Sequence, residues 1–199
     1  MVSNRKRHDV STCNISDAMK RGGSLGEFRF MTGVSGLVTG KAVTCRTEDG
    51  DWWAVVKAIE SAAKGDVVVV ESVHGQSRAV LGELLATEAA GRRVAAVVID
   101  GCVRDSSGLA KLGLPIYARG LVPHAGNPEK RGKISVPLTI NGVKIRPGDF
   151  IACDGNGAVA IPKAKYETVM AGARGIVEKE EKILKKMNAG ISISEILHF

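Results

Sequence analysis

Apolar and polar positions alternate along the chain with two different periods, which predict strands and helices in turn. Apolar runs or period-two patterns typical of strands cover residues 36–46, 67–70, 95–100 and 115–118. Helices are predicted, from apolar spacing or from capping residues, at residues 14–19, 51–64, 82–93 and 104–112. Because strands and helices alternate from residue 36 onward, the pattern favours parallel strands joined by crossover helices.

The second half of the chain predicts hairpins instead. A polar loop at residues 120–133 is followed by two pairs of segments, and an Asn-Gly dipeptide separates the members of each pair. Asn-Gly between such segments is the strongest local signal of a two-residue hairpin turn. We therefore expect an antiparallel meander with strands at residues 134–140, 143–146, 150–155 and 158–162.

The last part of the chain predicts helices. Residues 163–187 are highly charged with helical spacing, and a short helix follows at residues 191–197. The elements together predict an α/β protein, a mixed-sheet sandwich covered by helices rather than a doubly wound fold. One domain with a C-terminal helical arm is the simplest division of 199 residues.

Composition narrows the classes of partner. Aromatic residues make up only 4% of the chain, which argues against a surface that stacks nucleobases. The net charge of +7 comes from scattered residues, so we interpret it as solvated surface and do not expect nucleic acid as a partner. The four cysteines are widely spaced, without a C-x-x-C pair, which is typical of reduced thiols. No apolar run approaches the roughly 20 residues of a membrane span. These features predict a soluble protein of the cytoplasm.

One pair of segments brings together residues suited to acid chemistry. Gly82 lies at the start of a predicted helix, whose first N–H groups lack partners within the helix and favour an anion. Arg104 and Asp105 follow a buried strand, at the edge where α/β sheets bind ligands. Arginine suits a carboxylate or an enolate oxygen, and aspartate suits Mg²⁺ or Mn²⁺. An Arg-Asp pair after a strand is also common as a salt bridge or helix cap, so the residues alone leave both interpretations open.

Five motifs resemble one known family. They are ISDAM at 15–19, GELLA at 82–86, VIDGCVRD at 98–105, PIYARG at 115–120 and INGVKIRPGDFIACDGNGAVAIP at 140–162. Together with the twenty residues between Glu83 and Arg104, they are similar to the RraA-like family over roughly residues 14–163. This family includes class II 4-hydroxy-4-methyl-2-oxoglutarate/4-carboxy-4-hydroxy-2-oxoadipate aldolases and the regulator of ribonuclease E activity.

The resemblance implies a fold and a set of roles. The fold would be a three-layer β/β/α sandwich of the swivelling-domain type at residues 1–163. Residues 164–199 would form a helical arm on the same domain or on a neighbouring subunit of a homotrimer or hexamer. Asp105 would bind Mg²⁺ or Mn²⁺ directly and Glu83 would bind it through water, while Arg104 would bind the substrate and stabilise developing charge. Substrate carboxylate would be held by the backbone amides of Gly82, Glu83, Leu84 and Leu85.

The implied activity is that of a metal-dependent lyase. It would cleave 4-hydroxy-2-oxo acids to pyruvate, decarboxylate oxaloacetate, or do both, through a metal-stabilised enolate. Glu83 departs from the family, in which aspartate is common at this position. The family's aldolases add an acid from a neighbour's C-terminal helix, for which the candidates here are Glu178, Glu180 and Glu181. The alternative is a non-catalytic regulator that binds an RNA-degrading enzyme.

Four further side chains have two interpretations each. Arg119 ends the third parallel strand and either reaches the site or forms a salt bridge at the sheet edge. His74, at a strand end, is either a proton shuttle or a polar loop residue. Trp52 and Trp53 either pack on a neighbouring subunit or divide between core and rim.

Overall fold

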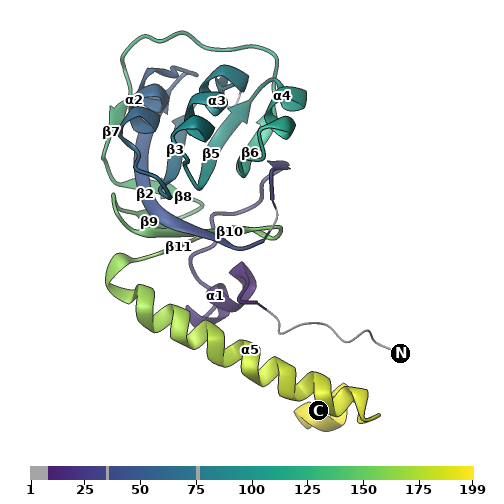
Figure 1. Cartoon of the computed structure of the whole chain (residues 1–199). Coiled ribbons are helices and arrows are strands. Elements are labelled where there is room, and N and C mark those ends of the chain that lie inside the picture. Colours follow the sequence, from purple (N-terminus) through teal and green to yellow (C-terminus); the bar gives the residue numbers. More distant parts are fainter. Residues whose placement is uncertain (1–8, 35, 75–76) are drawn as a thin grey trace.

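Four parallel strands form the centre of the fold, which this computed structural model describes at residues 9–34, 36–74 and 77–199 (Figure 1). Within that part of the chain, the main sheet has the strand order β1-β6-β5-β3-β2-β10-β11, with β4 beside β5 and β7 beside β2. The strands of this sheet are β1 (Phe30–Thr32), β2 (Val38–Glu48), β3 (Val67–Val73), β4 (Ala79–Leu81), β5 (Ala96–Val103), β6 (Ile116–Leu121), β7 (Lys133–Ile134), β10 (Phe150–Asp154) and β11 (Gly157–Ile161).

The helices connect and cover these strands. They are α1 (Thr12–Ala18), α2 (Trp53–Ser61), α3 (Glu83–Gly91), α4 (Ser106–Lys111), the short 3-10 helix η1 (Lys163–Lys165), α5 (Tyr166–Asn188) and α6 (Ile193–Leu197). Strands β2, β3, β5 and β6 pair in parallel, with α2, α3 and α4 in the crossovers between them. The parallel part of the sheet is therefore confirmed as the sequence predicts it.

Alternation along the central strands divides the core into two apolar layers. In β3, Val68 and Val70 pack toward the helices, while Val67 and Val69 pack toward the opposite face. Successive side chains of a strand point to opposite faces, so a strand buried on both sides must be apolar at every position. Each of these valines is fully buried, which stabilises the fold by about 1.5–3 kcal/mol per side chain.

A layer of hairpins covers the face of the sheet opposite α2, α3 and α4. Strands β8 (Leu138–Ile140) and β9 (Val143–Ile145) form a separate two-stranded sheet whose apolar side chains join the second core layer. Strand β10 pairs with β11 on one side and with the first half of β2 on the other. Helices, parallel strands and hairpins thus form the expected β/β/α layers, and α1 and α5 cover the outer face of β10 and β11 (Figure 1).

The predicted continuous meander is wrong in two respects, of which the smaller is that the second hairpin turns at Gly155-Asn156 and not at Asn156-Gly157. The segment expected to be one strand at residues 134–140 is two strands: Ile134 pairs with Cys45 of β2, and Leu138–Ile140 pairs with β9. Pro137 separates them because proline has no N–H group to donate to a strand ladder. The first hairpin therefore stands apart from β10 and β11. Strands β1 and β4, of three residues each, were not predicted.

The C-terminal arm begins on the body of the protein and leaves it. Val169 and Ala173 of α5 are buried in one cluster with residues of α1 and β11, and Val177, further along the helix, is also buried. Beyond them the arm exposes apolar side chains, including Leu184 and Met187. No helix within the described segments combines the length and the apolar character needed to cross a membrane.

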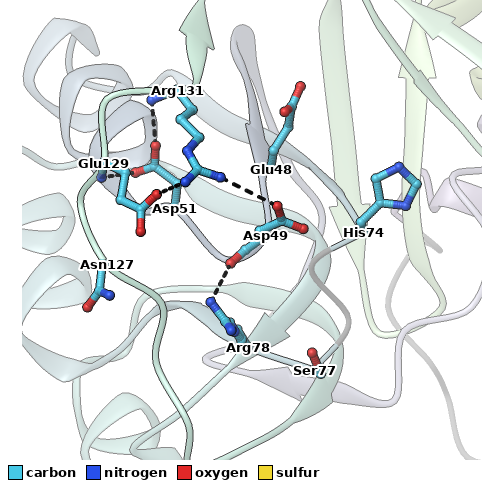
Figure 2. A pocket seen from close by; sticks show the side chains of 9 residues that line it. All are labelled: Glu48, Asp49, Asp51, His74, Ser77, Arg78, Asn127, Glu129 and Arg131. Carbon is cyan, nitrogen blue, oxygen red and sulfur yellow. Dashed lines mark hydrogen bonds and ion pairs between the residues drawn. The ribbon is translucent and has the colours of Figure 1, made fainter.

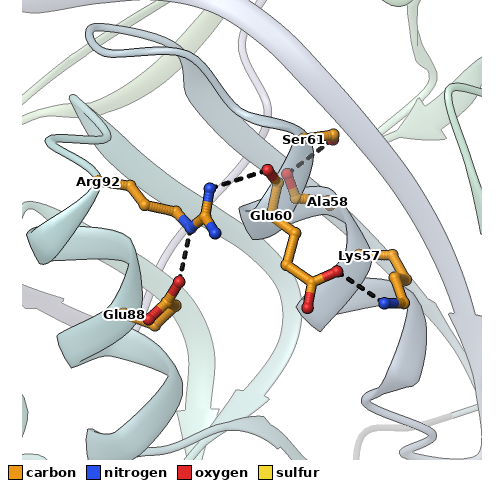
Figure 3. Close-up of polar contacts among 6 residues, drawn as sticks. All are labelled: Lys57, Ala58, Glu60, Ser61, Glu88 and Arg92. Atoms are coloured by element: carbon orange, nitrogen blue, oxygen red, sulfur yellow. Dashed lines mark hydrogen bonds and ion pairs between the residues drawn. The ribbon is translucent and has the colours of Figure 1, made fainter.

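Polar contacts hold α2 and α3 side by side (Figure 3). The Arg92 guanidinium donates from Nε to Glu88 Oε1 (2.6 Å) within its own helix and from Nη1 to the carbonyl oxygen of Glu60 in α2 (2.9 Å). Glu60 lies in the last turn of α2, where carbonyl groups lack partners inside the helix. Arg92 therefore satisfies an acceptor that the helix leaves open.

Replacing Arg92 by alanine should lower the free energy of unfolding by about 1 kcal/mol, since one hydrogen bond to a main-chain acceptor is lost. The exposed ion pair with Glu88 should add little to this. Urea denaturation measures the change, with Arg93→Ala as the matched control at the next position. An equal loss in both variants would contradict a specific contribution from the Glu60 contact.

Candidate active site

The two motif segments end at the same edge of the parallel sheet. Strand β4 runs beside β5 and leads directly into α3, while β5 leads into Arg104 and Asp105. The amide of Arg104 donates to the carbonyl oxygen of Leu81 (3.0 Å), which fixes the two chain segments next to each other. The start of α3 and the Arg104-Asp105 pair are therefore neighbours, as the edge position predicts.

Asp105 has an unusual backbone conformation that directs its carboxylate away from its own helix. It is the N-cap of α4 with φ 61° and ψ 43°, in the left-handed region that non-glycine residues seldom adopt. Its side chain makes no capping hydrogen bond in α4. Instead, Oδ2 accepts a hydrogen bond from the amide of Glu83 at the start of α3 (3.1 Å). The Asp105 carboxylate therefore accepts the hydrogen bond of one amide, that of Glu83, which was predicted to bind the substrate.

Arg104 lies beside this carboxylate. Its Nε is 3.6 Å from Asp105 Oδ2, which is an ion pair but too long for a hydrogen bond. The side chains are 42% and 43% exposed, so both charges remain in contact with solvent. The amides of Leu84 and Leu85 also belong to the first turn of α3 and have no acceptor within that helix. The start of α3 therefore brings the amides of Leu84 and Leu85 close to the Arg104 guanidinium and the Asp105 carboxylate.

Two glycines make room for the two acidic side chains. A Cβ atom added at Gly82 would lie 2.5 Å from Asp105 Oδ2 and 3.0 Å from Arg104 Nε. A Cβ atom added at Gly108, in α4, would overlap the carboxylate of Glu83. Side chains at either position would displace a carboxylate, so the absence of a Cβ atom there is part of the site.

Gly82, Arg104 and Asp105 line a pocket of about 270 Å³, whereas Glu83, whose carboxylate lies beside Gly108, is not among its lining residues. Its walls are mostly apolar, and its charged side chains are Arg104 and Asp105. Leu84 stands at the rim with 83% of its surface exposed. The full lining is Trp52, Ala79, Val80, Leu81, Gly82, Leu84, Leu85, Arg104, Asp105, Ala125 and Gly126. A mostly apolar pocket with a few polar groups is typical of a small-molecule site, and this one is of a size for a small molecule only.

A strap formed by residues 122–132 closes one side of this pocket, a position that the sequence does not predict. Trp52 donates from Nε1 to the carbonyl oxygen of Gly126 (3.0 Å). The buried carboxylate of Asp51 accepts from the amides of Glu129 (3.1 Å) and Arg131 (2.7 Å). An isolated bridge joins Ala125 to Ala79 of β4. Polar composition predicts a loop here, but neither that loop nor Trp52 carries a local signal of its position.

A second, more polar pocket of about 220 Å³ lies nearby, between β2 and the strap (Figure 2). Its charged residues pair mainly with one another: Arg131 contacts Glu129 and lies 3.6 Å from Asp49 Oδ2. Arg78 reaches the carbonyl oxygen of Asp49. His74 lines this pocket and not the one beside Arg104. Because four acidic side chains line this pocket against two arginines, it carries an excess of negative charge and is the weaker candidate for binding an acid.

Apart from Trp52, the other predicted candidates lie outside the pocket beside Arg104. Arg119 donates from Nε to Asp100 Oδ1 (2.6 Å) and lies over the ring of Phe28, so it forms the salt bridge at the sheet edge. Glu180 accepts a hydrogen bond from Asn14 of its own chain (3.1 Å). Trp52 and Trp53 are both partly buried against the core under α2.

Fold and site together define a mixed α/β protein whose sheet edge gathers an arginine, an aspartate and a helix start around a small pocket. A family model described as "RraA-like: Aldolase/RraA" matches residues 12–160. The chain belongs to the RraA-like family.

Individual relatives agree with this assignment. An uncharacterized protein of Methanocaldococcus jannaschii is 38% identical over 165 residues, 81% of this chain and 78% of that protein. A Halalkalibacterium halodurans protein named "Putative 4-hydroxy-4-methyl-2-oxoglutarate aldolase" is 37% identical over 137 residues, 69% of this chain and 65% of that protein. The solved structure of the RNA-processing inhibitor RraA from Thermus thermophilis has a TM-score of 0.68 at 28% identity and covers 78% of this chain and 94% of that chain. Both an aldolase name and a regulator thus occur among the relatives.

Proposed function

We propose that this protein is a divalent-metal-dependent lyase for small 2-oxo acids. It would cleave 4-hydroxy-2-oxo acids to pyruvate, decarboxylate oxaloacetate, or do both. The observation that carries the proposal is the meeting of Arg104, Asp105 and the open amides of α3 on one pocket. The aldolase name of the relative from Halalkalibacterium halodurans supports the same reaction class.

The substrate carboxylate has two sets of donors. The amides of Leu84 and Leu85 have no acceptor within α3, and the positive end of a helix favours an anion there. The Arg104 guanidinium carries two further N–H edges beyond the one near Asp105 and suits a carboxylate or an enolate oxygen. In the proposed reaction, these groups hold the pyruvyl end and offset the negative charge that grows on it.

The acidic residues fit a hard divalent cation. Mg²⁺ is usually held by one or two carboxylates and keeps several waters, so it needs no closed cage of side chains. Within the described residues no cluster of three or more histidine, cysteine or acidic side chains has metal-binding geometry. Asp105 and Glu83 are two carboxylates on neighbouring elements, and Gly82 and Gly108 leave space beside them. We assign direct binding to Asp105 and binding through water to Glu83.

A bound cation would act as a Lewis acid toward the enolate left by carbon–carbon bond cleavage. The chain's own residues fix the position of that chemistry. Asp105 is held in place by the Glu83 amide, and Trp52 and the strap shield one wall of the pocket from water. We also propose that the protein forms a trimer or hexamer in which a neighbouring subunit covers the exposed side chain of Leu84.

A pyruvate-release assay tests the proposal. With oxaloacetate or 4-hydroxy-4-methyl-2-oxoglutarate as substrate and Mg²⁺ or Mn²⁺ present, we expect turnover that a chelator abolishes and that added metal restores. Lactate dehydrogenase and NADH report the pyruvate. Absence of turnover with both substrates, combined with a stable complex with an RNA-degrading enzyme, would overturn the lyase in favour of the regulator.

A further inference from the structure

A groove of about 620 Å³ lies on another part of the molecule, where α1 ends, β9 passes and α5 begins (Figure 1). Its volume lies within the range of roughly 300–1,000 Å³ that is typical of ligand pockets. None of the residues that line it also lines the pocket beside Arg104. The lining residues are Ala18, Met19, Lys20, Gly22, Gly23, Val143, Lys144, Ala160, Pro162, Lys165, Thr168 and Val169.

The floor of this groove is apolar. Met19 and Val143 are the larger partly exposed apolar side chains of the lining, and Val169 and Ala160 lie almost buried beneath them. Gly23 has φ 82°, and a Cβ atom there would lie 2.8 Å from the carbonyl oxygen of Ala160. The turn after α1 therefore passes close to β11 without a side chain that would fill the groove.

The charged groups that line the groove all have the same sign. Lys20, Lys144 and Lys165 come from three separate elements, and none forms an ion pair with a described residue. The lining contains no aspartate or glutamate. Glu167, in the first turn of α5, offsets the partial positive charge of the helix start, so the positive charge of the groove comes from the three lysines. Apolar floor and cationic rim together match a ligand with an aliphatic body and one anionic end.

We propose that this groove binds a medium-chain fatty acid, with its carboxylate among the three lysines and its chain along the floor. Nucleic acid fits less well because the described lining offers no aromatic ring for a base to stack on. A zwitterion fits less well because no acidic side chain faces its cation. This site goes beyond the proposed lyase activity and does not depend on it.

Calorimetric titration of the full chain with decanoate, below its micelle concentration, tests the site. We expect saturable binding at one site per chain. Lys144→Gln combined with Lys165→Gln should weaken it by roughly three- to tenfold, because two partly exposed charge contacts are lost. Lys64→Gln with Lys186→Gln, which changes the net charge equally at exposed positions outside the groove, should leave it unchanged.

A blocking variant and two ligand controls make the result specific. Thr168 is exposed in the first turn of α5, so Thr168→Trp should fill the groove without disturbing the core and should abolish binding. Decan-1-ol and decyltrimethylammonium, which lack the anion, should bind at least tenfold more weakly. The proposal is overturned by an absence of saturable binding, by equal binding to Thr168→Trp, or by equal affinity for the alcohol. A change of oligomeric state in Thr168→Trp would also overturn it, since the groove would then be an interface between copies.

Discussion

Asparagine in place of Asp105 should lower metal-dependent pyruvate release by at least about 100-fold. Residues that only hydrogen-bond to a metal ligand typically cost about 10- to 100-fold when they are changed, and loss of a direct ligand should cost more. Asparagine keeps an oxygen that can accept the hydrogen bond from the Glu83 amide, but it removes the negative charge. The local backbone should therefore survive while the proposed metal ligand is lost. Glu83→Gln should cause a smaller loss because we assign that residue to contact through water.

Two measurements separate this effect from a folding defect. The melting temperature of the unchanged protein should rise with added Mg²⁺ or Mn²⁺, and this rise should vanish in Asp105→Asn. Asp49→Asn is the matched control, since Asp49 lines the other polar pocket (Figure 2) and should leave turnover intact. Full activity in Asp105→Asn, or loss of activity in Asp49→Asn alone, would place the chemistry elsewhere.

Replacing Asp154 by alanine should lower the free energy of unfolding by about 3 kcal/mol, because several hydrogen bonds to one buried charged group are lost together. Its carboxylate accepts from the amide of Thr12 (2.7 Å) and from the Thr12 hydroxyl (2.6 Å), and it also accepts from Asn156. These contacts anchor the start of α1 to the end of β10. Denaturation in urea measures the loss, and Asp17→Ala on the exposed face of α1 should cost far less.

The same carboxyl group predicts a dependence on pH. Burial raises the pKa of Asp154, but the hydrogen bonds from Thr12 and Asn156 outweigh burial and hold the pKa below its ordinary value. A lowered pKa in the folded state means that the stabilisation is present above the unfolded pKa, about 3.9, and is lost as the pH falls through the folded value. The deficit of Asp154→Ala should thus be full at pH 6 and shrink in strong acid. A deficit that stays constant down to pH 2 would contradict this.

The parallel half of the fold could be predicted because its strands are apolar on both faces. A run such as Val67-Val68-Val69-Val70 is suited to a strand between two apolar layers, and helices on either side of it fix the connection. Strands β1 and β4 could not be predicted, since three residues give no period. Neither could the split at Pro137, because the partner of each half depends on contacts that are distant in sequence.

The candidate site was predictable only in outline. Because β4 and β5 end at one sheet edge, the sequence placed the start of α3 near Arg104 and Asp105. The left-handed backbone of Asp105 decides where its carboxylate points, and that angle follows from tertiary packing rather than from local sequence. Trp52 was considered for packing alone, because its contact with Gly126 crosses 74 positions of the chain.

The hairpin of β10 and β11 is apolar on both faces, so the alternation of apolar and polar side chains does not specify its pairing register. When one face of a sheet is exposed to solvent, a register shift of one residue would bury polar side chains, so the shifted pairing is unfavourable. Here Ile151 and Cys153 face one apolar layer and Ala152 faces another, so hydrophobicity barely distinguishes the two frames. The two-residue turn at Gly155-Asn156, where Asp154 pairs with Gly157, fixes the register of the two strands. The Asp154 carboxylate and the hydrogen bond that the Tyr117 hydroxyl donates to the Asp154 carbonyl oxygen (3.1 Å) then fix this end of the hairpin against α1 and β6.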